Sequence, residues 1–157
     1  MTRHGMPIEE RFWAKVEKTE TCWNWTGSKP RGYGHFWNGV KAIKAHRYSY
    51  ELIHGPIAPG LILDHQCHNT VCVNPSHLNP VTIQQNAENR SGAQVNSVTG
   101  VRGVNWSKAA RKYEASVVLH QKRHYVGVFQ SLKEAEEAVI AKRNELHTNN
   151  LKDRSAA

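Results

Sequence analysis

Two cysteines and a histidine recur at regular spacing in the stretch "LDHQCHNTVCVNPSHLNPVTIQQN", residues 63–86. Four residues separate Cys67 from Cys72, and four more separate Cys72 from His77. Thiolate and imidazole are the groups that zinc binds, usually four of them in a tetrahedron. Because Cys22 is the only other cysteine, the sequence predicts a structural zinc site made of Cys22, Cys67, Cys72 and His77. The alternative is that these are ordinary buried cysteines, which behave as small apolar residues.

The charge balance favours a polyanionic partner. Lys and Arg number 21 against 13 Asp and Glu, a net charge of +8, and nucleic acid is the commonest partner of such a basic chain. A merely soluble basic protein is the alternative. No run reaches the roughly 18 apolar residues of a membrane span, and the polar N-terminal "MTRHGMPIEERFW" lacks the apolar core of a signal peptide. We therefore expect a cytoplasmic location and no membrane partner. In the reducing cytoplasm, cysteines serve as metal ligands more often than as disulfides.

Acid–base and oxygen-ligand groups lie on either side of the cysteine pair. Asp64 and His65 end the apolar stretch "LILD", and Thr82 with Gln85 forms a capping-box pattern that predicts a short helix carrying Asn86. A neutral histidine can take a proton from water. Carboxylate and amide oxygens suit Mg²⁺ or Mn²⁺. The pattern is typical of a hydrolytic site, although an isolated Asp-His pair is more often a surface hydrogen bond.

The rest of the chain predicts a mixed α+β fold in two modules. In the first we expect a helix over 7–18, a strand over 22–27, a hairpin over 34–47 with a type I′ turn at Asn38-Gly39, and a helix over 45–55. The polar stretch "AENRSGAQVNSVTG" is typical of a linker. In the second we expect strands over 100–106, 112–120 and 122–129, then a helix over 131–147 that begins with a Ser131–Glu134 capping box.

"DHQCHNTVCVNPSHLNPVTIQQNAENR" resembles the ββα-metal motif of HNH endonucleases, and most closely the phage-type HNH and His-Cys box homing endonucleases. With "CWNWTG", "GYGHFW" and "AHRYSYELIHGPI", the resemblance covers most of residues 8–91. It implies that His65 is the general base and that Asn86 and Asp64 hold a catalytic Mg²⁺ or Mn²⁺. Arg47, with Lys44 behind it, is the candidate for the arginine that such enzymes place near the scissile phosphate. An ordinary contact with the DNA backbone is the alternative for either residue.

The resemblance also gives zinc-ligand roles to Cys22, Cys67, Cys72 and His77. His77 stands where many HNH motifs have a middle asparagine, so that position is structural here rather than catalytic. Asn69 and Asn74 are expected to form turns, and His68 has no assigned role.

"TGVRGVNWSKAARKYEASV", "KRHYVGVFQSLKEAEEAV" and "AKRNELH" resemble the AP2-type DNA-binding domain, over roughly 99–147. The resemblance implies a three-stranded antiparallel sheet lying in the DNA major groove with a helix packed behind it. Alternation groups Arg102, Val104 and Trp106 along one strand and Arg123 and Tyr125 along another. We expect the DNA contacts to come from Arg102, Trp106, Arg111, Lys112, Arg123 and Tyr125, although packing is the alternative for the aromatic residues.

These patterns predict a nuclease domain over 1–91, a linker over 92–98, an AP2-like domain over 99–150 and a tail over 151–157. The expected function is a metal-dependent endonuclease of the homing type that acts on double-stranded DNA with one catalytic metal. The alternatives are a DNA-binding regulator whose zinc-stabilised nuclease module is inactive, and a nuclease acting on RNA or in phage DNA packaging. A homodimer would account for cleavage of both strands, and a phage-encoded protein of this kind would work in the host cytoplasm.

Overall fold

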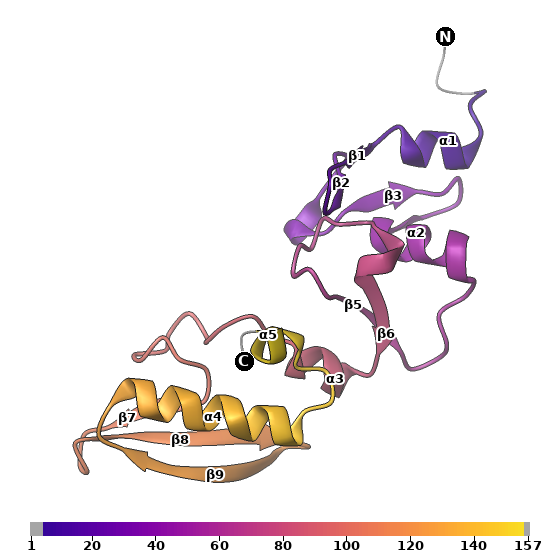
Figure 1. Cartoon of the computed structure of the whole chain (residues 1–157). Helices are drawn as coiled ribbons and strands as arrows, with labels where there is room; N and C mark the ends of the chain where they lie inside the picture. The colour runs from indigo at the N-terminus through magenta and orange to yellow at the C-terminus, as the bar shows by residue number, and fades with distance from the viewer. Residues whose placement is uncertain (1–4, 156–157) are drawn as a thin grey trace. The chain divides into compact units, whose positions relative to one another are not determined.

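The computed structural model describes residues 5–155 and has a mixed α and β architecture (Figure 1). The chain divides into two compact units, the first ending at Thr82 and the second beginning at Ile83. Composition places the end of the first domain at residue 91, but the segment from 83 onward packs within the second unit. Within the described residues, no helix combines the length and hydropathy needed to cross a membrane.

The first unit is built from short elements. Its helices are α1 (Ile8–Trp13) and α2 (Ala45–His54), with single turns of 3₁₀ helix, η1 and η2, at Pro30–Gly32 and Pro75–His77. Three antiparallel pairs of strands follow in chain order: β1 (Val16–Lys18) with β2 (Trp23–Trp25), β3 (His35–Trp37) with β4 (Ala42–Lys44), and β5 (Ile62–His65) with β6 (Leu78–Val81). Two-stranded sheets are only marginally stable by themselves, so this unit depends on what packs between them.

Aromatic side chains form the core of the first unit. Phe12 and Trp25 are fully buried and stack with ring centroids 5.1 Å apart, and Phe36 meets Phe12 edge-on at 5.1 Å. The N-terminal helix is shorter than the periodicity suggests, since α1 ends at Trp13 and Val16 pairs with Trp25 in a sheet. Pairing with a strand that carries the central tryptophan takes precedence there over the helical pattern.

The β3–β4 hairpin turns at the expected place, with the Asn38 N–H donating to the Lys41 carbonyl at 3.1 Å. Its turn is not of type I′, because only Gly39 has a positive φ, of 93°, and type I′ requires two such residues. The Asn38 side chain accepts instead from the backbone N–H groups of Val40 and Lys41, at 3.1 and 2.8 Å. An Asx-type turn therefore closes the hairpin.

The second unit holds a three-stranded antiparallel sheet in the order β7 (Val104–Ser107), β8 (Lys112–Leu119), β9 (Lys122–Phe129). Helix α4 (Leu132–Leu146) lies along one face of the sheet (Figure 1). Its first turn has the expected capping box between Ser131 and Glu134. Two short helices flank these elements, α3 (Ile83–Glu88) before the sheet and α5 (Leu151–Ser155) where a tail was expected.

Small and branched apolar side chains form the core between α4 and the sheet: Val104, Ala115, Val117, Ala135 and Val139. The chain enters β7 through Gly103, which has a φ of +86°. A Cβ there would lie 2.6 Å from the Ser116 carbonyl oxygen, so only glycine fits. The β8–β9 turn places two non-glycine residues, His120 and Gln121, at positive φ, as a type I′ hairpin requires.

Candidate functional site

The predicted zinc ligands meet in the first unit. The ligand atoms of Cys22, Cys67, Cys72 and His77 all lie within 4.8 Å of one another. His77 Nδ1 is 3.8 Å from the Cys22 Sγ and 3.7 Å from the Cys72 Sγ. Three thiols and one imidazole converging on one point are a donor set that fits tetrahedral zinc.

Backbone pairing carries Cys22 to ligands some 50 residues away in the chain. Trp25 donates its N–H to the Val71 carbonyl at 2.9 Å, and the Val73 N–H donates to the Trp23 carbonyl at 2.7 Å. The loop of residues 71–73 therefore runs beside β2 like an added strand, with Cys72 buried. Residue Cys22, immediately before β2, lies at the start of this pairing.

Two of the three clustered thiols, those of Cys67 and Cys72, resist ionisation when no cation is bound. Burial, with the neighbouring thiols, raises the pKa of Cys67 to about 12, and burial also raises the pKa of Cys72. Burial acts in the same direction on Cys22, but hydrogen bonds with Asn69 and the other two thiols lower its pKa overall. A bound metal ion would offset this resistance, since thiolate is the form that binds metal.

His65 is oriented by the zinc loop. It ends β5, is 7% exposed, and its Nε2 lies 3.1 Å from the Cys72 carbonyl oxygen. A carbonyl only accepts hydrogen bonds, so Nε2 carries the proton and Nδ1 of the neutral ring has a free lone pair. Burial lowers the pKa of His65, against the opposing effects of the Cys72 carbonyl and Asp64. The ring is therefore neutral near pH 7 and can accept a proton at Nδ1.

A second buried histidine lies against His65 and was not anticipated from the sequence. The His46 ring on α2 meets the His65 ring with centroids 4.8 Å apart, and Tyr33 lies within 6.2 Å of both. Burial, with the neighbouring His65 and Lys44, lowers the pKa of His46 to about 3. His46 is thus neutral, and its ring packs against His65, the candidate base. Its only signal in the sequence is the "AHR" in which it precedes Arg47.

The candidate phosphate-binding side chains, Lys44 and Arg47, lie on either side of His46 in the sequence. Lys44 Nζ is 2.9 Å from His35 Nε2 and 4.9 Å from the centroid of the Tyr33 ring. Arg47 follows on α2, with its side chain 41% exposed and an Nη2–Oε1 distance of 3.4 Å to Glu51. An exposed pair of this kind is weak, so Arg47 keeps its freedom to bind a phosphate.

Asp64 and Asn86, the predicted oxygen ligands, belong to different units. Asp64 is buried on β5 beside His65 in the first unit. Asn86 is half-buried on α3 in the second. The Cys and His set is the one group of three or more His, Cys, Asp or Glu side chains within the described residues that is arranged to hold a metal. A catalytic ion would have few protein ligands, as Mg²⁺ often does when water and phosphate complete its shell.

The predicted DNA-contact residues of the second unit do not all lie on the same face of its sheet. The register pairs Val118 with Arg123 and Ser116 with Tyr125, and these side chains lie on the face away from α4. We call this face of the sheet the open face. Lys112 lies two positions before Glu114 and four before Ser116 on β8, so strand alternation places its side chain on the open face as well. Arg123 and Tyr125 are exposed there, Tyr125 by 65%.

Trp106 and Arg102 are placed differently. Val104 is 2% exposed in the core, so alternation turns Trp106 to the side of α4, where its ring meets Tyr113 at 4.8 Å. Arg102 donates to backbone carbonyls of residues 87–90. Neither shares the open face with Arg123 and Tyr125. Arg111, at a φ of 51°, is exposed in the β7–β8 turn.

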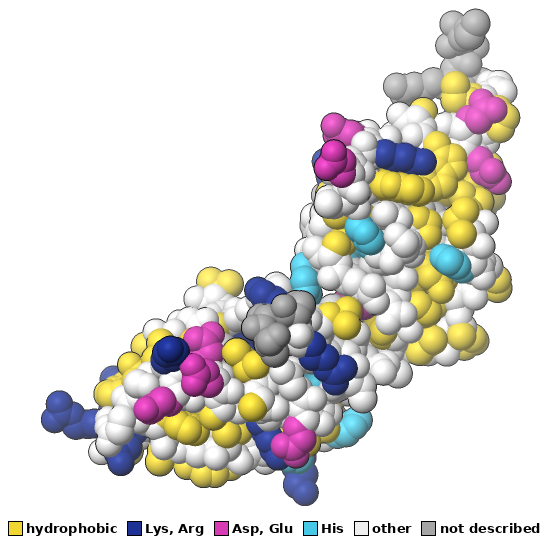
Figure 2. Space-filling model, in the orientation of Figure 1, with side chains coloured by type: hydrophobic (Ala, Val, Ile, Leu, Met, Phe, Trp, Pro, Cys, Tyr) yellow, Lys and Arg dark blue, Asp and Glu magenta, His cyan; other side chains and the backbone are white. Residues whose placement is uncertain are grey.

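Charged side chains are unevenly distributed over the visible side of the second unit. Asp and Glu side chains gather along α4, whereas Lys and Arg side chains project from the ends of the unit (Figure 2).

Comparison with known proteins finds a family match in the second half of the first unit and in helix α3. Residues 44–88 match the family model described as HNH endonuclease. The match runs from Lys44 through the histidines, the cysteine loop and β6 to the end of α3. HNH nucleases act on DNA. The match includes His65 and three members of the Cys and His cluster, Cys67, Cys72 and His77, but not Cys22.

Two proteins of Escherichia phage T7 are similar to this chain. Protein 7.7 is 39% identical over 70 residues, which cover 44% of this chain and 54% of that protein. Protein 2.8 is 30% identical over 86 residues, or 52% of this chain and 58% of that protein. The chain therefore spans a little over half of each relative's length. No solved structure matches it.

Proposed function

We propose that this protein is a metal-dependent DNA endonuclease of the homing type, with an HNH domain that hydrolyses the phosphodiester bond and an AP2-like sheet that binds double-stranded DNA. The observation that carries the proposal is the contact of His65 Nε2 with the Cys72 carbonyl. It links the zinc loop to the base and leaves Nδ1 as the atom that can accept a proton. A purely structural zinc module has no need of a neutral, oriented histidine beside its cluster.

His65 Nδ1 takes a proton from the attacking water, and the buried position of the ring keeps it unprotonated near neutral pH. Asp64 and Asn86 would supply oxygen ligands to one Mg²⁺ or Mn²⁺, which would neutralise charge on the scissile phosphate and on the departing oxygen. Arg47 binds a phosphate oxygen, with Lys44 as the nearby second cation. His46 and Tyr33 pack against His65 on one side.

The open face of the sheet supplies affinity for DNA through Lys112, Arg123 and Tyr125. Basic side chains neutralise phosphates and release counterions, and the aromatic ring lies against the duplex. Arg111 adds a contact from the β7–β8 turn. Trp106 and Arg102 are left out of this interface because their side chains serve packing and backbone contacts within the second unit.

Cleavage of supercoiled plasmid across a Mg²⁺ and Mn²⁺ series tests the function. The wild type should nick or linearise the plasmid, and His65→Ala should lower the rate about 10²- to 10⁴-fold. His68→Asn, in the same loop but with no role in the site, should cleave like the wild type. If wild type and His65→Ala are equally inert at every metal concentration while both still bind DNA, the chain is a DNA-binding regulator instead.

A further inference from the structure

Helix α2 begins with basic side chains, at the end of a helix that favours negative charge. Lys44 is its N-cap, His46 and Arg47 follow in its first turn, and no acidic residue lies there. The first N–H groups of a helix have no partners within it and form the positive end of its dipole. The Lys44 side chain makes no capping bond to them. Positive charge at this position destabilises the free helix, and a bound anion would offset the effect.

A buried polar atom without a partner lies in the same turn. His46 is 8% exposed, and its Nδ1 has no hydrogen-bond partner among the residues that the structure describes. Burial is the largest cause of the lowered pKa of His46, and the next four causes are all basic side chains. A neutral imidazole protonated at Nδ1 donates one hydrogen bond. A buried donor of this kind favours a ligand that brings an acceptor, such as a phosphate oxygen.

Lys44 is held in a defined position beside this turn. It pairs with His35 across the β3–β4 hairpin, and its Nζ lies 2.9 Å from His35 Nε2. An ammonium has only donors, so His35 Nε2 is the acceptor and the imidazole ring is neutral. The same ammonium lies 4.9 Å from the centroid of the Tyr33 ring, within the range of a cation–π contact. Among the described residues, no ion pair joins a carboxylate to Lys44, so its charge is available to an external anion.

The candidate base lies beside these groups. The Tyr33 ring that contacts Lys44 has its centroid 5.9 Å from the His46 ring and 6.2 Å from the His65 ring. The two histidine rings are 4.8 Å apart. One aromatic side chain therefore lies against both the cation and the histidine that would activate water. All of these residues belong to the first unit, so the arrangement is complete without the second.

We propose that the first turn of α2 and the Lys44 ammonium bind a backbone phosphate of the DNA beside His65, and that His35 is the positioning residue that orients Lys44. The inference rests on the proposed function, because it takes DNA as the substrate and His65 as the base. It extends that function by giving Lys44 a defined place and by assigning roles to His35 and to the N-terminus of α2. A phosphodiester suits the site because its charge complements both the ammonium and the helix dipole.

The test uses the full-length chain with Lys44→Met, His35→Leu, His35→Gln and the control Lys41→Met. Lys41 is exposed in the turn of the same hairpin, so its replacement removes the same charge from the same element. Two quantities are measured for each protein. One is the change in the amide NMR shifts of residues 45–48 on titration with inorganic phosphate, compared with sodium chloride at equal ionic strength. The other is the rate of plasmid cleavage in Mg²⁺.

Phosphate should shift these amides in the wild type, and chloride should not. Lys44→Met should weaken phosphate binding and slow cleavage, each about tenfold or more. His35→Leu removes the acceptor without removing charge, so both quantities should fall by a smaller factor. His35→Gln keeps an acceptor for the ammonium and should restore most of both, which a merely structural role for the ring would not predict. Lys41→Met should match the wild type.

The proposal is overturned if phosphate shifts these amides no more than chloride does, or if Lys44→Met and His35→Leu both behave like Lys41→Met. Equal losses in His35→Leu and His35→Gln would refute the positioning role. His35→Leu also keeps the test decisive should Lys44→Met fail to fold. Failure of the proposed function looks different. A wild type that never cleaves, or a His65→Ala that cleaves normally, refutes the nuclease assignment, whereas the phosphate titration still reports whether the site binds the anion.

Discussion

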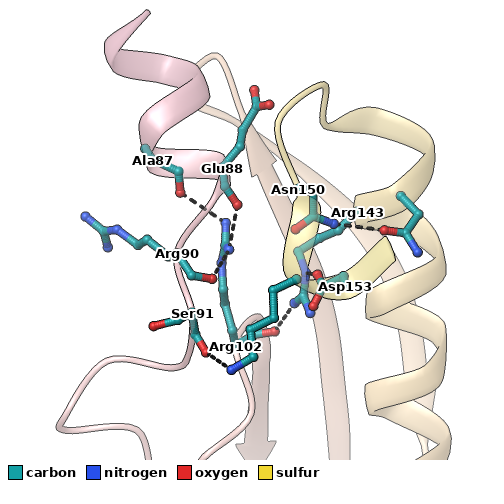
Figure 3. Close-up of polar contacts among 10 residues, drawn as sticks. Ala87, Glu88, Arg90, Ser91, Arg102, Arg143, Asn150 and Asp153 are labelled. Atoms are coloured by element: carbon teal, nitrogen blue, oxygen red, sulfur yellow. Dashed lines mark hydrogen bonds and ion pairs between the residues drawn. The ribbon is translucent and has the colours of Figure 1, made fainter. Parts of the chain in front are cut away.

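The two units are stabilised by different kinds of interaction. The first has three two-stranded sheets, an aromatic core and a cluster of potential metal ligands that brings Cys22 beside residues 67–77. The second has a longer sheet, a 15-residue helix and a core of small branched side chains. It also has a buried polar network of Glu88, Arg102, Arg143 and Asp153, which we call the clasp (Figure 3). The comparison shows where each unit is vulnerable: the first at its Cys and His cluster, and the second at its charged partners.

Cys72→Ser should have the largest effect. Structural zinc contributes about 10–16 kcal/mol at pH 7 in small zinc domains, far more than a small unit can lose. We expect bound zinc to fall, the first unit to unfold, cleavage to disappear and the second unit to keep its dispersed NMR signals. Elemental analysis and two-dimensional NMR measure this. Ser76→Ala, in the same loop but not a ligand, is the control, and unchanged zinc in Cys72→Ser would refute the ligand assignment.

Asp153→Asn tests the charged clasp of the second unit. The change leaves Arg143 buried without its carboxylate partner, and breaking a buried pair in this way costs about 3 kcal/mol. Urea denaturation followed by NMR signals of the second unit gives the change in free energy of unfolding. The control is Lys142→Ala, whose pair with Glu145 is exposed and contributes about 0–1 kcal/mol. Equal effects of the two changes would contradict the role given to the clasp.

The same variant has a pH signature. Burial alone would raise the pKa of Asp153, but hydrogen bonds from Arg143 and Asn150 lower it overall. A carboxylate whose folded pKa is lowered stabilises the fold above its unfolded pKa, about 3.9. That stabilisation is lost as the pH falls through the lower, folded value. Wild type should therefore lose stability on acidification below about pH 4, and Asp153→Asn should lose less.

Arg123→Gln should have the smallest effect. It removes one proposed phosphate contact from the open face, so DNA affinity should fall a few-fold and the slope of log affinity against log salt should decrease by about 1. Fluorescence anisotropy with duplex DNA across a salt series measures both. Lys133→Gln, on the outer surface of α4, is matched in charge and should change neither quantity. An effect of Lys133→Gln equal to that of Arg123→Gln would move the interface away from the open face.

Local patterns carried much of the prediction. The capping box at Ser131, the start of α3 at Ile83 and the three strands of the second unit lie where the sequence predicts them, because capping and alternation depend on neighbours in the chain. The Cys and His cluster was also predicted, since three of its four members share one loop. The end of α1 at Trp13 was not, because strand pairing with β2 outweighs the helical period there.

What the sequence by itself determined is the chemistry of the site: a zinc-type donor set, an Asp-His pair and an excess of positive charge. Only the tertiary structure decided how these groups are held. Buried Val104 turned Trp106 toward α4, packing brought His46 against His65, and the Cys72 carbonyl selected the protonated nitrogen of His65. Hydrogen bonds of Arg102 and Glu88 hold α3 within the second unit. Each of these contacts joins residues distant in the chain, so no local pattern encodes it.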